Sequence, residues 1–164
     1  MILLKKILVA TDFGEASDAA LSYGRDLART YGATLHVVNV AENILARYAG
    51  DGTLALLPQL QNDVEEAARK RLEALVTGED RTLLHAKPVV LTALGTAEAI
   101  VEYAHTHNVD IIVMGTHGRR ALAHLLMGSV AERVVRTAPC PVLTVRHPEH
   151  EFIAPDALVA VARA

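Results

Sequence analysis

The chain has 164 residues and a mass of 17.6 kDa, a length that fits one domain with a hydrophobic core of its own. Hydrophobic residues make up 51% of it and charged residues 21%, a composition that excludes disorder over most of the chain. Sixteen Lys and Arg residues against nineteen Asp and Glu residues give a net charge of -3, with no basic stripe or tail. Because proteins bind nucleic acids by neutralising their phosphates, we expect no nucleic-acid partner.

Cysteine content and hydropathy indicate in which cellular compartment the protein is found. Cys140 is the only cysteine, which excludes an intramolecular disulfide and a cysteine-rich zinc module. No apolar run reaches the roughly 18 to 20 residues of a membrane span. The apolar residues at 1–4 are followed at once by Lys5 and Lys6, so we expect no signal peptide. The sequence therefore predicts a cytoplasmic protein with no membrane partner.

Apolar runs alternate with helical spacing along the chain. Short apolar runs predict strands at 7–11, 35–40, 83–91, 110–114 and 141–146. Apolar residues at helical spacing predict helices over 16–31, 64–75, 96–104 and 127–138. Gly32 is expected to end the first helix, Thr96 to cap the third, and residues 41–58 to form an irregular loop. Pro88 has no amide donor, which places its strand at a sheet edge.

This alternation predicts an α/β fold, because parallel neighbouring strands need right-handed helical crossovers. We expect a single open five-stranded parallel sheet of order 3-2-1-4-5 with helices on both faces, a Rossmann-like arrangement. The domain is expected to span residues 1–147, followed by a C-terminal tail at 148–164. The ligand crevice of such a sheet lies where the winding reverses, here after the strands at 7–11 and 110–114.

Glycines gather after the fourth predicted strand. Gly115, Gly118, Gly128 and Ser129 follow the pattern Gly-x2-Gly-x9-Gly-Ser. Glycine lets the backbone approach a ligand closely, and the helix that begins at Gly128 and Ser129 presents amides that favour phosphate. The sequence contains no Walker loop and no Gly-x-Gly-x-x-Gly after the first strand. The pattern therefore predicts a phosphate-binding site of another type.

These segments resemble the universal stress protein family, and within it the ATP-binding branch. The resemblance covers residues 5–146. It is carried by Ile-Leu-Val-Ala-Thr-Asp at 7–12, Ile-Val-Met-Gly-Thr-His-Gly at 112–118, Leu-Met-Gly-Ser-Val-Ala at 126–131 and Cys-Pro-Val-Leu-Thr-Val at 140–145. It implies the same sheet order, ATP in the crevice, and a homodimer joined through the fifth strand at 142–146. Mg2+ would be carried in by the triphosphate and needs no all-protein cage.

The resemblance also implies which residues contact the nucleotide. Asp12 would meet its ribose or phosphate side, and the backbones of Thr11 and Val40 would bracket adenine. The phosphates and ribose would be enclosed by Gly115, His117, Gly118, Arg119, Gly128, Ser129 and Val130, and the expected set is completed by Ala10 and Met114. Gly14 stands where many members have serine, and because glycine is an acceptable N-cap we expect only a small loss of stability.

Helix starts offer a simpler interpretation of two of these residues. Ser129 forms the pattern Ser-x-x-Glu with Glu132, which is typical of a capping box. Asp12 could serve only to start the first helix, because acidic side chains favour helix N-termini. Capping and phosphate contact are compatible for Ser129.

Simpler interpretations also apply outside the helices. Gly115 and Gly118 could be turn glycines, and Arg120 could be a solvated charge. The histidine pairs at 105/107 and 147/150 imply no third ligand at a suitable spacing, so no metal site is expected.

Three functions follow from these patterns. The first is an ATP-binding regulator or sensor of the stress response, whose nucleotide state governs its interactions and whose ATP turnover is slow or absent. The second is an enzyme that hydrolyses ATP slowly or transfers a phosphoryl group, and the third is a nucleotide-free dimeric interaction module. The three glycines argue against the third. Against the second, the sequence shows no assembled metal-binding carboxylate pair and no obvious water-positioning base.

Overall fold

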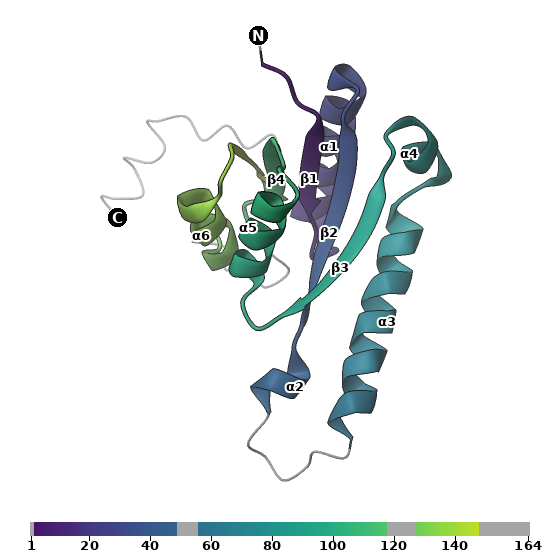
Figure 1. Ribbon diagram of the computed structural model, residues 1–164, viewed down its shortest axis with the longest axis vertical. Coiled ribbons are helices and arrows are strands. Elements are labelled where there is room, and N and C mark those ends of the chain that lie inside the picture. The colour runs from purple at the N-terminus through teal and green to yellow at the C-terminus, as the bar shows by residue number, and fades with distance from the viewer. Residues whose placement is uncertain (1, 49–55, 118–126, 148–164) are drawn as a thin grey trace, which may run out of the picture.

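The computed structural model describes residues 2–48, 56–117 and 127–147, which form one open sheet of five parallel strands flanked by helices (Figure 1). The strands are β1 (Lys6–Ala10), β2 (Thr34–Glu42), β3 (Lys87–Ala93), β4 (Ile111–Gly115) and β5 (Val142–Val145). The helices are α1 (Glu15–Tyr31), α2 (Ile44–Arg47), α3 (Leu57–Leu75), α4 (Gly78–Leu83), α5 (Thr96–Thr106) and α6 (Ser129–Thr137). The strand order is β3-β2-β1-β4-β5, so the predicted α/β class and sheet order are confirmed.

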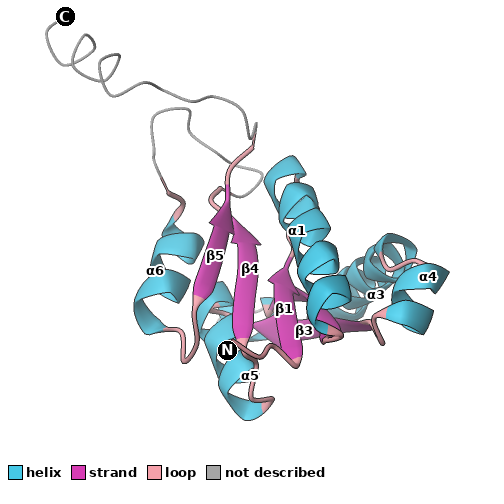
Figure 2. Ribbon diagram, turned by 90° about the horizontal axis from the view of Figure 1, so that it is seen from above, coloured by secondary structure: helices cyan, strands magenta, loops and turns pink. Residues whose placement is uncertain are grey.

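The sheet divides the core into two layers, because successive side chains of a strand point to opposite faces. In β1, Ile7 and Val9 join the cluster beneath α1, α3 and α4, whereas Leu8 and Ala10 join the cluster beneath α5 and α6. Figure 2 shows these two groups of helices on opposite sides of the sheet. Ile7, Leu8 and Val9 are fully buried, as expected for a central strand that is covered on both faces.

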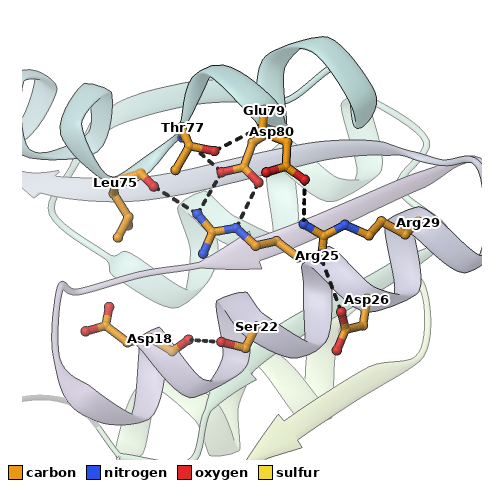
Figure 3. A network of polar contacts seen from close by, with 9 residues as sticks. All are labelled: Asp18, Ser22, Arg25, Asp26, Arg29, Leu75, Thr77, Glu79 and Asp80. Carbon is orange, nitrogen blue, oxygen red and sulfur yellow. Dashed lines mark hydrogen bonds and ion pairs between the residues drawn. The ribbon is translucent and has the colours of Figure 1, made fainter.

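An ion pair between the half-buried Arg25 and the buried Asp80 joins α1 to the start of α4 (Figure 3). The Arg25 guanidinium donates to the two carboxylate oxygens of Asp80 at 2.9 and 2.7 Å, and to the carbonyl of Leu75 at 2.9 Å. Asp80 also accepts from the amide of Thr77, whose hydroxyl accepts from the amide of Asp80, a capping box that starts α4. Burial opposes ionisation of Asp80, but the hydrogen bonds from Arg25 and Thr77 outweigh it and hold its pKa below the ordinary value.

The segment at 83–86 is not part of a strand, contrary to the prediction from its apolar residues. The capping box starts α4, which runs to Leu83, and β3 begins only at Lys87. Leu84 is the buried C-cap of α4, and its carbonyl accepts from the amide of Leu35. Among the described residues β3 pairs with β2 alone, so the edge position predicted from Pro88 is confirmed.

Other boundaries also differ from the prediction. The helix expected from residue 64 begins at Leu57, with Pro58 in its first turn, where a missing amide costs no hydrogen bond. Residues 41–58 contain the end of β2 and the short α2, which Asn43 caps by accepting from the amide of Ala46 at 2.8 Å. The expected Thr96 cap is wrong: Thr96 is the first residue of α5, Gly95 is the N-cap, and no side-chain cap bond forms.

Candidate functional site

The carboxyl ends of β1 and β4 lie side by side in the middle of the sheet. The two strands pair in register as far as Ala10 and Met114, and the chain then leaves the sheet through residues 11–14 and 116–117. The winding reverses here, since β2 and β3 lie on one side and β5 on the other. Open α/β sheets bind their ligands at such a position. We call this region, residues 11–14, 115–117 and 128–130, the switch-point edge.

The start of α6 is fastened to the switch-point edge. The amide of Gly128 donates to the carbonyl of Thr116 at 2.7 Å, and the amide of Thr116 donates to the carbonyl of Val145 at 2.8 Å. Gly128 is the N-cap of α6, Ser129 is exposed, and Val130 packs against the cluster beneath α5 and α6. The first amides of a helix lack intrahelical partners and carry the positive end of its dipole. This helix end therefore favours an anion beside Thr116.

The capping box predicted for Ser129 and Glu132 does not form. Gly128 is the N-cap, so Ser129 lies one residue too far along the helix, and α6 has no side-chain cap bond. Glu132 instead forms an ion pair with Arg136 one turn later, at 3.0 Å. Capping therefore does not explain the serine at this position.

Three buried polar side chains, Thr11, Ser17 and Asn39, support the loop that follows β1; they are 5, 4 and 6% exposed. The side-chain amide of Asn39 donates to the carbonyl of Thr11 at 2.8 Å, and the hydroxyls of Thr11 and Ser17 lie 3.1 Å apart. The Thr11 hydroxyl accepts from the amide of Phe13 at 2.9 Å. The Ser17 hydroxyl accepts from the amide of Gly14 at 3.1 Å and donates to its carbonyl at 2.8 Å. A satisfied buried network of this kind holds one loop geometry.

The same loop presents Asp12 next to a strained residue. Asp12 is half-buried, and its Oδ1 accepts from the amide of Gly14 at 3.1 Å. Phe13 has a φ of 63°, in the left-handed region that bulky residues rarely adopt. Gly14 is the N-cap of α1, as expected. The bond to Gly14 supports the simpler interpretation of Asp12 as a helix-start residue, and a carboxylate has acceptor sites for several further partners.

Gly115 is required by the packing of α1. A Cβ at this position would lie 2.9 Å from both the backbone carbonyl carbon and the Cβ of Ala16. The start of α1 therefore sits directly against the end of β4, and only glycine leaves room for it. The sequence suggested a turn or a ligand approach at Gly115, and the structure adds a further reason for glycine, the close approach of α1.

The remaining predicted site residues are placed as follows. Ala10 and Met114 are buried beneath α5 and α6, and Val40 is half-buried against the same cluster at the end of β2. His117 is half-buried, with its Nδ1 3.0 Å from the hydroxyl of Thr116. The predicted site residues Gly118 and Arg119 lie outside the described part of the chain, as does Arg120, which was interpreted as a solvated charge.

Three residues that shape this edge were not predicted: Ser17, Asn39 and Thr116. Asn39 did carry a signal, because it is a polar residue within the apolar run at 37–40. Ser17 lies three residues after the glycine N-cap of α1, where a capping-box partner is found. Thr116 is 8% exposed, and its backbone links β5 to α6.

The part of the chain that the structure describes offers no second kind of site. No group of three or more His, Cys, Asp or Glu side chains there could hold a metal ion. None of the described helices is both long and apolar enough to cross a membrane. Cys140 is a half-buried free cysteine, and burial together with the charge of Asp110 raises the pKa of its thiol. A raised pKa keeps this cysteine in its less reactive thiol form.

Comparison with known proteins identifies the family. The model that describes the Universal stress protein family matches residues 4–146 of this chain. The chain belongs to the universal stress protein family. A universal stress protein of Methanocaldococcus jannaschii, MJ0531, is 32% identical over 152 residues, which cover 91% of this chain and 86% of the relative. The family that the sequence motifs predicted is confirmed.

Solved structures of related proteins share the fold of this universal stress protein. Protein MJ0577, also from Methanocaldococcus jannaschii, matches with a TM-score of 0.74 at 27% identity, covering 89% of this chain and 98% of that one. A universal stress protein solved in complex with cAMP matches with a TM-score of 0.56 at 23% identity, covering 88% and 98% of the two chains. At that identity the second likeness concerns the fold alone.

Proposed function

We propose that this universal stress protein belongs to the ATP-binding branch, binds ATP at the switch-point edge, and acts in the cytoplasm as a nucleotide-dependent regulator or sensor of the stress response. One observation carries the proposal. The bond from Gly128 to Thr116 brings the anion-favouring start of α6 to the end of β4, beside the loop that presents Asp12. One universal stress protein that shares this fold was solved in complex with cAMP, an adenine nucleotide.

In this proposal each part of the edge has a separate task. The backbones of Thr11 and Val40 bracket adenine, and Asp12 meets the ribose or phosphate side. The phosphates meet the α6 amides and the loop before them; the residues assigned to them are Gly115, His117, Gly118, Arg119, Gly128, Ser129 and Val130. Ala10 and Met114 supply the buried strand ends beneath the nucleotide. Mg2+ would arrive on the triphosphate, where it needs few protein ligands.

The direct test is the nucleotide content and the ATP response of the purified protein. Mass measurement of the small molecules released on denaturation should detect an adenine nucleotide. ATP at a hundredfold excess over its Kd should stabilise the fold by about 2.7 kcal/mol, because it binds only the native state. Gly118→Val should abolish this protection.

Gly78→Val is the matched control, because a Cβ at Gly78 at the start of α4 would meet nothing within 4 Å. It makes the same chemical change away from the switch-point edge and should keep the full ATP shift. Equal ATP shifts in wild type, Gly118→Val and Gly78→Val would overturn the assignment of the site.

ATP turnover should be slow or absent. Phosphoryl transfer needs an attacking group held in line as well as neutralisation of the developing charge, and the helix end with Arg119 serves only the second need. A multiple-turnover assay with Mg2+ should give a rate well below the roughly 1 to 100 s⁻¹ of kinases. A rate within that range that is lost in Asp12→Asn or His117→Ala, while binding survives, would favour the enzyme instead.

The outer edge of β5 supports a homodimer through residues 142–146. Among the described residues β5 pairs with β4 alone. The carbonyls of Pro141 and Val145 both accept hydrogen bonds from backbone amides on the β4 side. In a parallel ladder Thr144 then faces outward, so its amide can pair with a second copy across a two-fold axis. Sedimentation should show a dimer at micromolar concentration that Thr144→Pro converts to a monomer. A monomeric wild-type protein would refute this assembly.

A further inference from the structure

We propose that Arg71 of α3 is a positioning residue for the nucleotide, acting through the ring of Phe13 in the loop that carries Asp12. The inference rests on the function proposed above. The guanidinium carbon of Arg71 lies 4.2 Å from the centroid of the Phe13 ring, well within the range of a cation–π interaction. A helix on one face of the sheet thereby reaches a loop at the switch-point edge.

The loop needs such a hold because its backbone is strained at Phe13. The left-handed φ of 63° brings Cβ too close to the backbone, and it persists only where the surroundings determine it. The peptide amides before and after the Phe13 Cα both donate hydrogen bonds. The amide of Phe13 donates to the Thr11 hydroxyl, and the amide of Gly14 donates to the carboxylate of Asp12. A relaxed φ at Phe13 would rotate these peptides and move Asp12. Whatever holds the ring of Phe13 therefore also holds Asp12.

Within the described part of the chain, two surfaces contact the ring. Phe13 packs against the hydrophobic cluster beneath α1, α3 and α4, and the guanidinium of Arg71 covers a ring face. The neighbouring Leu72 is buried in that cluster and Leu75 packs against it, which fixes the face that α3 turns toward the sheet. None of the ion pairs among the described residues includes Arg71, so its charge is not committed to a carboxylate there.

Planarity makes arginine the suited residue for this contact. A guanidinium stacks flat on an aromatic face, whereas the lysine ammonium is a strongly hydrated point charge. Arg71→Lys keeps the charge and should recover only part of the effect. Arg71→Met keeps most of the apolar stem and removes the stacked cation.

The first arm of the test needs no nucleotide. Hydrogen exchange of the backbone amides is measured in the wild type, Arg71→Met and Arg69→Met. Arg69→Met is the matched control, since Arg69 is exposed on the same helix and its loss changes the net charge equally. Arg71→Met should speed exchange at Phe13 and Gly14 while leaving the amides of β1 unchanged, and Arg69→Met should change neither. Unchanged exchange at Phe13 and Gly14 in Arg71→Met would overturn the inference.

The second arm measures the Kd for ATP in the same proteins and in the Phe13→Leu background. Arg71→Met should weaken ATP binding about two- to fivefold, the factor that a partly exposed cation–π contact contributes. Arg71→Lys should lie between Arg71→Met and wild type, and Arg69→Met should match wild type. The Arg71→Met effect should disappear when Phe13 is already leucine.

Each outcome separates the inference from the proposed function. ATP binding by the wild type with an unchanged Kd in Arg71→Met would refute the inference and leave the function standing. A loss that persists in Phe13→Leu, or that Arg69→Met reproduces, would show that Arg71 acts on ATP by charge and would also refute it. Absence of ATP binding in the wild type would refute the proposed function and the nucleotide role of Arg71 with it.

Discussion

Two polar networks among the described residues have different partners and different consequences. The network of Arg25, Asp80 and Thr77 is charged and joins α1 to the start of α4, between regular elements (Figure 3). The network of Thr11, Ser17 and Asn39 is neutral and supports a short loop with a left-handed residue. The comparison indicates that the first sets how strongly the helices dock, whereas the second sets the shape of the switch-point edge. Each can then be broken separately.

The largest effect should follow from breaking the charged network. Asp80→Ala leaves Arg25 without its partner in a site where the Asp80 side chain is 3% exposed, and such a loss costs about 3 to 5 kcal/mol of unfolding free energy. Urea unfolding should show this loss. Asp26→Ala is the control, because it removes a mostly exposed partner of Arg29 and should change stability little.

The affinity for ATP separates the two networks in this experiment. Asp80→Ala should leave the Kd for ATP unchanged under conditions where the variant remains folded. A large fall in affinity would show that the two networks are not independent. A loss of stability no greater than that of Asp26→Ala would show that the ion pair does not fasten α1 to α4.

A third buried polar group differs from both networks because it is only partly satisfied. His36 is 3% exposed; its Nδ1 lies 2.8 Å from the hydroxyl of Tyr103, and its Nε2 has no partner among the described residues. Burial, followed by the charges of Lys87, His107 and Lys6, lowers the pKa of His36 to about 4. The native state therefore favours the neutral imidazole.

Acid should consequently destabilise the protein over a defined range. In the unfolded chain a histidine has a pKa of about 6.5. Below that pH the unfolded chain therefore binds more protons than the native state. The contribution of neutral His36 to the free energy of unfolding is fully present above about pH 6.5. This contribution falls by up to roughly 3 kcal/mol as the pH drops to about 4. His36→Gln, which keeps an acceptor for Tyr103, should flatten unfolding free energy against pH in this range. An unchanged slope would show that His36 is not the responsible group.

The smallest change in stability should follow from breaking the neutral network. Asn39→Ala removes one hydrogen bond to the carbonyl of Thr11 and should cost about 1 to 3 kcal/mol. Because this bond ties the loop after β1 to the end of β2, the variant should also weaken ATP binding, which calorimetric titration can measure. A normal ATP affinity in Asn39→Ala would contradict the division of tasks between the networks.

The sequence predicted the features of this fold that depend on repeated patterns. Unbroken apolar runs located the central strands, and Gly32 ends α1 with a left-handed φ of 63°, as its position after the periodic residues indicated. Local patterns failed where a tertiary contact decided the outcome. Residues 83–86 read as strand because the apolar pattern cannot register that Asp80 binds Arg25 across the fold and caps α4.

The candidate site shows the same division. Strand order alone brought Asp12 and Gly115 to one edge, and this could be predicted from the alternation of elements. The structural reason for glycine at position 115 could not be predicted, because it depends on how closely Ala16 of another element, α1, approaches it. The left-handed Phe13 also carried no signal, since phenylalanine is not a turn residue and its conformation depends on the side chains around it.

Amide chemical-shift mapping during an ATP titration tests the central claim most directly. At saturating ATP with Mg2+, the account predicts that the largest shifts occur at residues 11–14, at Val40, and at residues 115–117 and 128–130. The amides around Arg25 and Asp80 should stay unchanged. Shifts confined to other parts of the sheet, or no shifts at millimolar ATP, would contradict ATP binding at the switch-point edge.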